Sequence, residues 1–226
     1  LKAHGLDLRK LHIVPNGISP EEWQGAAASL APAIATHIAQ QRAGGRQVVV
    51  YAGSHGEPNA LDVLLDAAAA LRTEPFAFVL VGDGHEKARL AQRVQAEGDA
   101  LRQVRLFEPI PKAQIPALLA AADIAYIGWK RQPLYRFGIA PNKLMDYMMA
   151  GVPVLHSVEA GNDPVAEAGC GLTVAPESAE AVAQGLRRLA ALSPGARRAM
   201  GERGRDFVLA HHAYPVLARR FLESLG

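Results

Sequence analysis

Short apolar runs rich in β-branched and aromatic residues alternate with longer helix-like stretches along most of this chain. This alternation is typical of βαβ units, in which helices connect and cover parallel strands. The runs predict strands at 47–52, 76–81, 104–107, 124–127, 153–155 and 171–174. Helices are expected at 59–71, 85–97, 112–121, 142–149, 179–192, 194–210 and 214–225. The sequence therefore predicts an α/β fold, a doubly wound parallel sheet with extra C-terminal helices.

The composition favours a folded domain and disfavours several functional classes. Half of the residues are hydrophobic and the net charge is only +2, without a long Lys or Arg run, so we expect no nucleic-acid partner. A single cysteine, Cys170, excludes an intrachain disulfide and fits a reducing compartment. No apolar run reaches the roughly 18 residues that would span a bilayer. We expect a cytoplasmic domain, and leave open a peripheral position at the inner membrane face for the full-length protein.

The first 44 residues lack the alternation seen later. The chain begins without Met, and a polar stretch at 1–10 leads to an apolar run that ends at Pro15-Asn16-Gly17. We expect a domain boundary here with partner sequence upstream, the alternative being a processed, complete protein. The sequence is divided into the end of an interdomain linker (1–30), the main domain (31–210) and a final helix (211–226).

Ligands of open α/β sheets bind at the carboxyl ends of the strands, so the loops after the strands are the candidate sites. Gly53-Ser54-His55-Gly56 follows the first strand and precedes a helix. Its glycines allow a ligand to approach the backbone closely, and the free N–H groups of the next helix suit an anion. The alternative is a simple tight turn.

The loop after the second strand is Gly82-Asp83-Gly84. Neither this loop nor the first contains GxGxxG, which removes the main support for a dinucleotide-dependent dehydrogenase. Asp83 is interpreted either as a ligand contact or as the cap of the helix that begins near His85.

A third loop, Arg136 to Asp146, leads into a helix that begins near Pro141. The backbone N–H groups of Gly138 and Ile139 would lie before the positive end of that helix. Lys143 falls in its first turn, where a cation is unfavourable unless an anion such as a phosphate compensates it. A hydrogen bond to such a charged group contributes about 1.5–3 kcal/mol.

Asp146 follows Lys143 by three residues, so both are expected to face one cleft. A diphosphate would repel a carboxylate, so Asp146 is better suited to accept hydrogen bonds from the vicinal hydroxyls of a ribose. The alternative is a Lys–Asp pair on the surface.

Several motifs recur in an order known from one enzyme family. They are Val14-Pro15-Asn16-Gly17, Tyr51-Ala52-Gly53, Val81-Gly82-Asp83-Gly84, Ala122-Asp123-Ile124, Pro141-Asn142-Lys143-Leu144-Met145-Asp146-Tyr147-Met148-Met149-Ala150-Gly151-Val152-Pro153-Val154 and Asp163-Pro164-Val165-Ala166-Glu167-Ala168-Gly169-Cys170-Gly171. Together they resemble the C-terminal half of GT-B glycosyltransferases of family four, the retaining group 1 enzymes. The resemblance covers nearly the whole chain.

This resemblance implies a Rossmann-like domain that binds the nucleotide diphosphate of a sugar donor. The chain's own N-terminal domain, absent here, would bind a glycan or lipid-linked acceptor, and the final helix at 214–225 would cross back to it. We expect transfer of a hexosyl or N-acetylhexosaminyl group from a nucleotide sugar, with UDP as the expected nucleotide and with retention. The expected pathway is polysaccharide or lipopolysaccharide biosynthesis of a bacterial surface, and the fragment alone is expected to be inactive.

The resemblance and the loops together give one set of candidate substrate-binding residues. They are Gly53, Ser54, His55, Gly56, Gly82, Asp83, Arg136, Gly138, Ile139, Lys143 and Asp146. Family members often hold the base near positions that correspond here to Leu106, Glu108 and Ile110.

Three positions depart from the family pattern. Many members carry an Arg and a Lys that bind the diphosphate where this chain has Ser54 and Asn59, and a Glu that contacts the donor sugar where it has Gly138. We expect Lys143 and Arg136 to supply the cationic charge instead, with Lys143 stabilising the leaving group.

No cofactor and no metal is required by this scheme, because no His, Cys or Asp spacing indicates a metal site. A nucleotide-sugar 2-epimerase of GT-B fold is one alternative. A non-catalytic nucleotide-binding or interaction domain is another, suggested by the three departures.

Overall fold

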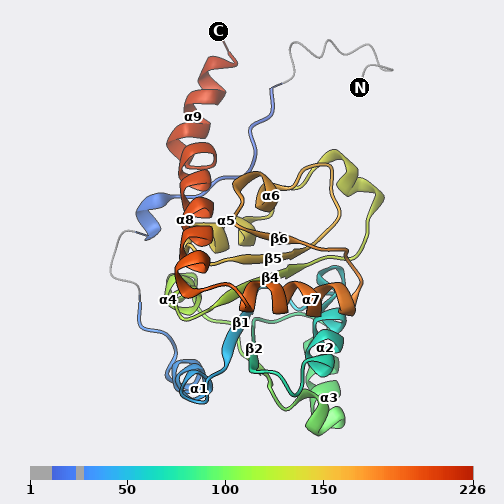
Figure 1. Cartoon of the computed structure of the whole chain (residues 1–226). Helices are drawn as coiled ribbons and strands as arrows, with labels where there is room; N and C mark the ends of the chain where they lie inside the picture. The colour runs from blue at the N-terminus through green and yellow to red at the C-terminus, as the bar shows by residue number, and fades with distance from the viewer. Residues whose placement is uncertain (1–11, 24–27, 226) are drawn as a thin grey trace.

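The computed structural model of the chain describes residues 12–23 and 28–225, which form a doubly wound α/β sandwich (Figure 1). Its six-stranded sheet has the order β3-β2-β1-β4-β5-β6, and every neighbouring pair is parallel. The strands are β1 (Gln47–Ala52), β2 (Phe76–Val81), β3 (Val104–Phe107), β4 (Ile124–Gly128), β5 (Val154–Ser157) and β6 (Gly171–Thr173). The fold prediction is therefore confirmed, and the strand order reverses direction between β1 and β4.

Helices connect the strands and continue after the last one. They are α1 (Pro32–Ala43), α2 (Leu61–Ala70), α3 (Lys87–Glu97), α4 (Ile115–Ala120), α5 (Asn142–Met149), α6 (Pro164–Ala168), α7 (Ala179–Ala190), α8 (Pro194–His211) and α9 (Tyr214–Glu223). Short 3-10 turns occupy Pro20–Trp23, Glu57–Asn59, Gly98–Leu101, Lys112–Gln114 and Pro133–Phe137. Helix α6 has no counterpart among the predicted helices, because five residues are too few to show a helical period.

The four central strands β2, β1, β4 and β5 are buried on both faces, and their alternate residues belong to two separate cores. Val48 and Val50 pack with α1, α4, α5 and α8, whereas Val49 and Tyr51 pack with α2 and α7. In Figure 1 the first group of helices lies on one side of the sheet and the second on the other. Burial on both faces explains why the strands are continuous apolar runs in the sequence.

The sheet opens at the carboxyl ends of β1 and β4. The β1–β2 ladder continues to the pair Ala52 and Val81, but the β1–β4 ladder ends at Val50 and Ala125. The buried hydroxyl of Tyr147, on α5, replaces the missing strand partner of Ala52. It accepts a hydrogen bond from the N–H of Ala52 at 2.8 Å and donates one to the carbonyl of Ala52 at 3.1 Å. This contact holds α5, through a residue of its last turn, beside the end of β1.

The segment before the sheet is tied to the C-terminal helices. The N–H of Ile18 donates to the carbonyl of His212 at 2.9 Å, and the N–H of Tyr214 donates to the carbonyl of Ile18 at 3.0 Å. Helix α9 then projects away from the sheet (Figure 1). The sequence predictions for 1–11, 24–27 and 226 lie outside the described residues, so the 1–30 linker is described only in part.

Helix α8 packs closely on the turn that follows α5, and Gly201 allows this approach. A Cβ at position 201 would overlap with the carbonyl oxygen of Gly151. Gly195, near the start of the same helix, has open space around it.

We predict that Gly201→Ala lowers the free energy of unfolding by about 1–3 kcal/mol, the usual cost of overpacking. Gly195→Ala is the matched control and should leave stability unchanged or raise it slightly, because Ala is the better helix former. Urea unfolding followed by circular dichroism measures both. Equal stability of the two variants would contradict this view of the α5–α8 contact.

Candidate functional site

The loops after β1 and β2 lie against each other at the carboxyl edge of the sheet. The N–H of Gly53 donates to the carbonyl of Val81 at 3.0 Å, and that of His55 donates to the carbonyl of Asp83 at 2.8 Å. A side chain at Gly82 would overlap with the carbonyl of Gly53, so only glycine permits this approach. The structure thus brings the first two predicted loops together.

Lys143 reaches from the first turn of α5 across the end of β1 to the first loop. Its ammonium nitrogen donates to the hydroxyl of Tyr51 and to Oδ1 of Asn59, each at 2.8 Å, and lies 4.4 Å from the centre of the Tyr51 ring. A Cβ at Gly53, whose φ is 147°, would lie 2.9 Å from the same nitrogen. Gly53 therefore leaves the space that Lys143 occupies.

No carboxylate within the described residues forms an ion pair with Lys143. The alternative of a Lys143–Asp146 surface pair is therefore wrong. Burial away from water disfavours the ammonium ion and lowers the pKa of Lys143 to about 8. The result is a cation without a compensating charge at the point where the strand order reverses.

Asp146 lies one turn further along α5 and lines a different space, a cavity of about 240 Å³. The other lining residues are Glu22, Trp23, Lys112, Ala113, Ile115 and Pro116. Burial raises the pKa of Asp146 to about 6, an effect that Lys112 partly opposes. Lys143 and Asp146 thus share a helix, but their side chains meet different neighbours.

The amides of Gly138 and Ile139 are already used within the protein. The N–H of Gly138 donates to the carbonyl of Tyr135 at 2.9 Å, and that of Ile139 donates to Oδ1 of Asn162 at 2.7 Å. The amide nitrogen of Asn162 donates in return to the carbonyl of Ile139 at 3.0 Å. A diphosphate would have to displace these partners, so binding by the two amides stays a prediction.

Ser54, Gly56, Asp83 and Arg136 occupy less informative positions in the loops. Asp83 is exposed and accepts a hydrogen bond from the N–H of Gly84 at 2.8 Å, while α3 begins only at Lys87, so Asp83 does not cap that helix. The guanidinium of Arg136 lies 4.6 Å from the centre of the Phe137 ring. The exposed Ser54 contributes a carbonyl that accepts from the Tyr51 hydroxyl at 2.6 Å.

His55, within the first loop, has a fully buried side chain. Neither of its ring nitrogens has a hydrogen-bond partner in the described part of the chain. Burial is the main cause that lowers the pKa of His55 to about 4, and the nearby Lys87 adds to this effect. The ring is therefore neutral at physiological pH. It contributes shape rather than charge to the site.

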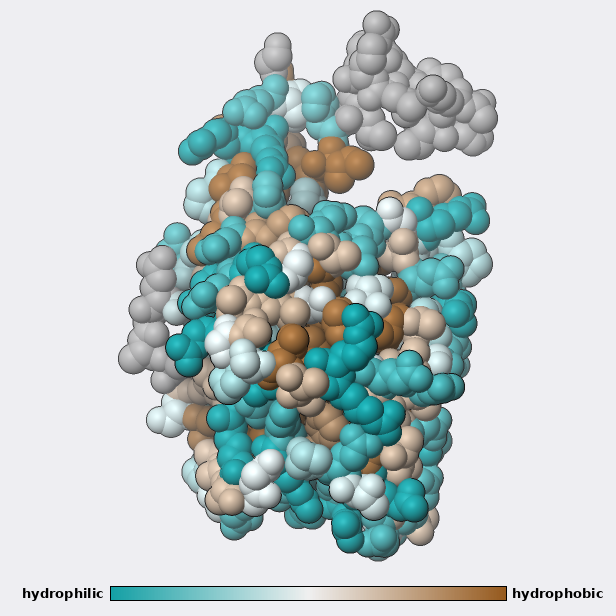
Figure 2. Space-filling model, viewed as in Figure 1, coloured by the Kyte–Doolittle hydropathy of each residue, from teal (hydrophilic) through white to brown (hydrophobic). Residues whose placement is uncertain are grey.

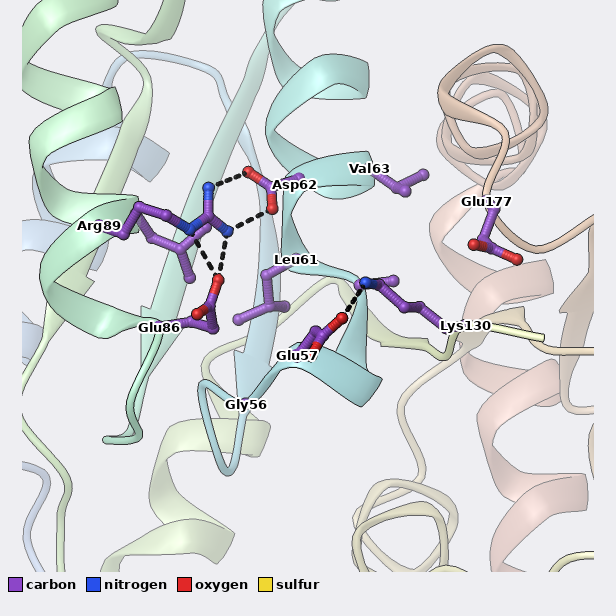
Figure 3. A pocket seen from close by; sticks show the side chains of 11 residues that line it. Gly56, Glu57, Leu61, Asp62, Val63, Glu86, Arg89, Lys130 and Glu177 are labelled. Atoms are coloured by element: carbon purple, nitrogen blue, oxygen red, sulfur yellow. Dashed lines mark hydrogen bonds and ion pairs between the residues drawn. The ribbon is translucent and has the colours of Figure 1, made fainter. Parts of the chain in front are cut away.

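A separate cavity of about 410 Å³ lies beside Gly56, between α2 and α3 (Figure 3). In Figure 3 the guanidinium of Arg89 contacts both Asp62 and Glu86, and the ammonium of Lys130 contacts Glu57. Both cations are thus neutralised within the protein. Lys143 differs from them in lacking such a partner.

Sequence reasoning missed the residues that hold the site together. Tyr51 and Tyr147 enter the sequence analysis only as members of predicted elements and family motifs, although their hydroxyls bind Lys143 and Ala52. Asn59 was noted only as a departure from a family pattern. A tyrosine near the carboxyl end of an otherwise apolar strand is a sequence signal for a polar contact at that end, because its buried hydroxyl needs a hydrogen-bond partner.

The residues expected near a nucleobase lie in or just after β3, the edge strand next to β2. Glu108 is exposed and forms an ion pair with Lys87 at 2.7 Å, while Leu106 and Ile110 are half-buried. Within residues 12–23 and 28–225, no group of three or more His, Cys, Asp or Glu side chains could hold a metal ion. In the same part of the chain, no helix has the length and apolar character needed to cross a bilayer.

Solved structures share this fold. A glycosyltransferase from Rickettsia africae ESF-5 matches 97% of this chain and 57% of its own, with a TM-score of 0.77 at 17% identity. HepE from Anabaena, in complex with UDP, matches 99% of this chain and 59% of its own, with a TM-score of 0.76 at 17% identity. This chain therefore spans somewhat more than half of each of these structures.

Sequence comparison gives a narrower result. WcaI of Escherichia coli K12, a protein assigned to glycosyl transfer in colanic acid biosynthesis, is 32% identical over 147 residues, which are 63% of this chain and 35% of WcaI. A sequence profile described as glycosyl transferases group 1 matches residues 46–191, the segment that contains the whole sheet and Lys143. Because this segment is more than half of the chain, the chain belongs to the group 1 family of glycosyl transferases.

Proposed function

We propose that this chain binds the diphosphate of a nucleotide sugar at the opening between β1 and β4 and serves as the donor-binding part of a glycosyltransferase. The observation that carries this proposal is the partly buried ammonium group of Lys143, which has no carboxylate partner among the described residues. An anion is the ligand that such a group favours, and the carboxyl edge at a strand-order reversal is where open α/β sheets bind ligands.

Lys143 would act when the bond between the anomeric carbon and the diphosphate breaks. Negative charge then accumulates on the leaving diphosphate, and a fixed cation in a partly dehydrated site stabilises it more than water would. The ammonium group has three N–H donors, two of which bind Tyr51 and Asn59. The third would donate to a phosphate oxygen.

Asp146 would accept hydrogen bonds from the ribose hydroxyls of the same nucleotide. Its carboxylate lines a cavity walled by Trp23 and Ile115. The position of Asp146 one turn beyond Lys143 supports a ligand that runs from diphosphate to nucleoside along α5.

The proposed donor is a UDP sugar, and the proposed reaction transfers a hexosyl or N-acetylhexosaminyl group with retention. The complex of Anabaena HepE with UDP supports the choice of nucleotide. The similarity to WcaI supports a role in polysaccharide biosynthesis, with a glycan or lipid-linked acceptor. We propose no metal and no cofactor.

The proposed partner of this chain is an N-terminal acceptor-binding domain that packs on α9. Several large apolar side chains in and just after α9 are exposed, namely Tyr214, Phe221, Leu222 and Leu225. Ile13 and Val14, in the segment before the sheet, are exposed as well. Figure 2 shows hydrophobic surface among the polar residues of this projecting end. Burying it against a second domain would remove that apolar area from water.

We predict that Lys143→Met weakens UDP binding about ten-fold or more, as expected for the loss of one hydrogen bond to a charged group. Lys130→Met is the matched control, because Lys130 is already paired with Glu57. This variant should change the Kd less than two-fold, because it removes only an exposed ion pair of small energetic value. Isothermal titration calorimetry on this chain measures both. Unchanged affinity in Lys143→Met would refute the site, and absence of saturable UDP binding to the parent chain would favour an interaction domain.

We predict that the affinity for UDP-glucose falls on both sides of an optimum between about pH 6 and pH 8. Below pH 6 Asp146 gains a proton, since burial raises its pKa to about 6, and it no longer accepts hydrogen bonds as a carboxylate. Above pH 8 Lys143 loses its charge, since burial lowers its pKa to about 8. Calorimetry across this range should show that Asp146→Asn removes only the acid limb. Two unchanged limbs in that variant would exclude Asp146 from the site.

A radiolabelled UDP sugar added to the complete protein, with glycan acceptors, identifies the reaction by its product. A labelled glycan is the expected result. A labelled nucleotide sugar epimerised at C2 would instead indicate the 2-epimerase.

A further inference from the structure

We propose that Asn59 and Tyr51 are positioning residues that hold the ammonium group of Lys143 against the donor diphosphate while leaving its charge uncompensated. This inference rests on the proposed function and adds that the neutrality of position 59 is a requirement of the site. It assigns a role to a residue that departs from the family pattern.

The geometry of the three side chains carries the inference. Asn59 ends the short 3-10 turn Glu57–Asn59, and its amide oxygen accepts from Lys143 at 2.8 Å. Tyr51 accepts from the same nitrogen at 2.8 Å and donates its own proton to the carbonyl of Ser54 at 2.6 Å. That proton keeps the lone pairs of the Tyr51 oxygen turned toward Lys143. Two acceptors from two elements thus fix a long side chain that would otherwise be mobile.

In the described part of the chain, the two side chains that bind the ammonium nitrogen of Lys143, those of Tyr51 and Asn59, are neutral, and so is the ring of His55 near them. Burial raises the pKa of Tyr51, so its hydroxyl keeps its proton, and burial lowers the pKa of His55 to about 4, so its ring carries no charge. Asp146, on the same helix, lies in the separate cavity with Lys112 and Glu22. The acceptors therefore satisfy the donors of the ammonium group without cancelling its charge.

A carboxylate in place of the Asn59 amide would have the opposite effect. Asp is nearly isosteric with Asn, so it would keep the hydrogen bond but add a negative charge next to the ammonium group. The ion pair would stabilise the charged lysine without ligand and repel the incoming diphosphate. Replacing Asn59 by Asp therefore tests whether Asn59 positions an uncompensated cation or only supports the structure of the loop.

We predict that Asn59→Asp weakens UDP-glucose binding about ten-fold or more at pH 7, the size expected for a lost interaction with a charged group. The basic limb of the affinity profile should move from near pH 8 to higher pH, because the new carboxylate raises the pKa of Lys143. An NMR titration of the lysine side chains should show the same upward shift. Gln132→Glu adds an equal charge to an exposed position at the same edge of the sheet and should leave both limbs in place.

Asn59→Ala and Tyr51→Phe remove one acceptor each and remain informative if Asn59→Asp folds poorly. Each should weaken binding about three-fold or more, since the net contribution of a typical hydrogen bond corresponds to about that factor and each variant leaves the ammonium group with one positioning acceptor. If Lys143→Met weakens binding but the variants at 59 and 51 match the parent in affinity and pH profile, the positioning roles are refuted and the donor site stands. If Lys143→Met itself binds normally, both proposals fail.

Discussion

The hydroxyl of Tyr147 on the backbone of Ala52 is the interaction on which the candidate site depends. A strand at the centre of a parallel sheet must satisfy its backbone groups on both edges, and unpaired buried groups are costly. Once β1 separates from β4, Ala52 loses its strand partner on that side, and a side chain from α5 replaces it. The helix is thereby fixed with its first turn over the end of β1. Lys143 can reach Tyr51 only because of this placement.

The site keeps a charge where stability alone would favour an apolar residue. A partly buried ammonium group without an ionic partner among the described residues is a destabilising feature, which the lowered pKa of Lys143 expresses. The glycines at 53 and 82 serve the same arrangement, since they give up side-chain packing to let a lysine and a neighbouring loop approach. Such departures from a well-packed, neutral interior are typical of binding sites.

The central strands could be predicted from the sequence because they are buried on both faces and form largely apolar runs. The start of α2 could not: Glu57–Asn59 forms a 3-10 turn and Ala60 has a φ of 48°, so the helix begins at Leu61 rather than at 59. Loop positions were predicted from the topology rule alone, and the structure brings the first two loops together.

Side-chain directions were harder to predict than elements. Helical spacing predicts that Lys143 and Asp146 face one cleft. In the structure the lysine side chain follows its hydrogen-bond acceptors, which come from β1 and the turn after it, and only Asp146 lines the cavity beside Trp23. The amides of Gly138 and Ile139 are bound by a loop carbonyl and by Asn162, a residue far along the chain. Contacts of this kind depend on the tertiary structure, which no local pattern contains.

The backbone pair between Ile18 and the turn before α9 has a mechanical consequence. Two stretches from opposite ends of the chain are fastened to each other beside the sheet, so neither can swivel independently of the other. A movement of α9 would therefore be transmitted to the segment around Ile18 through these two backbone hydrogen bonds.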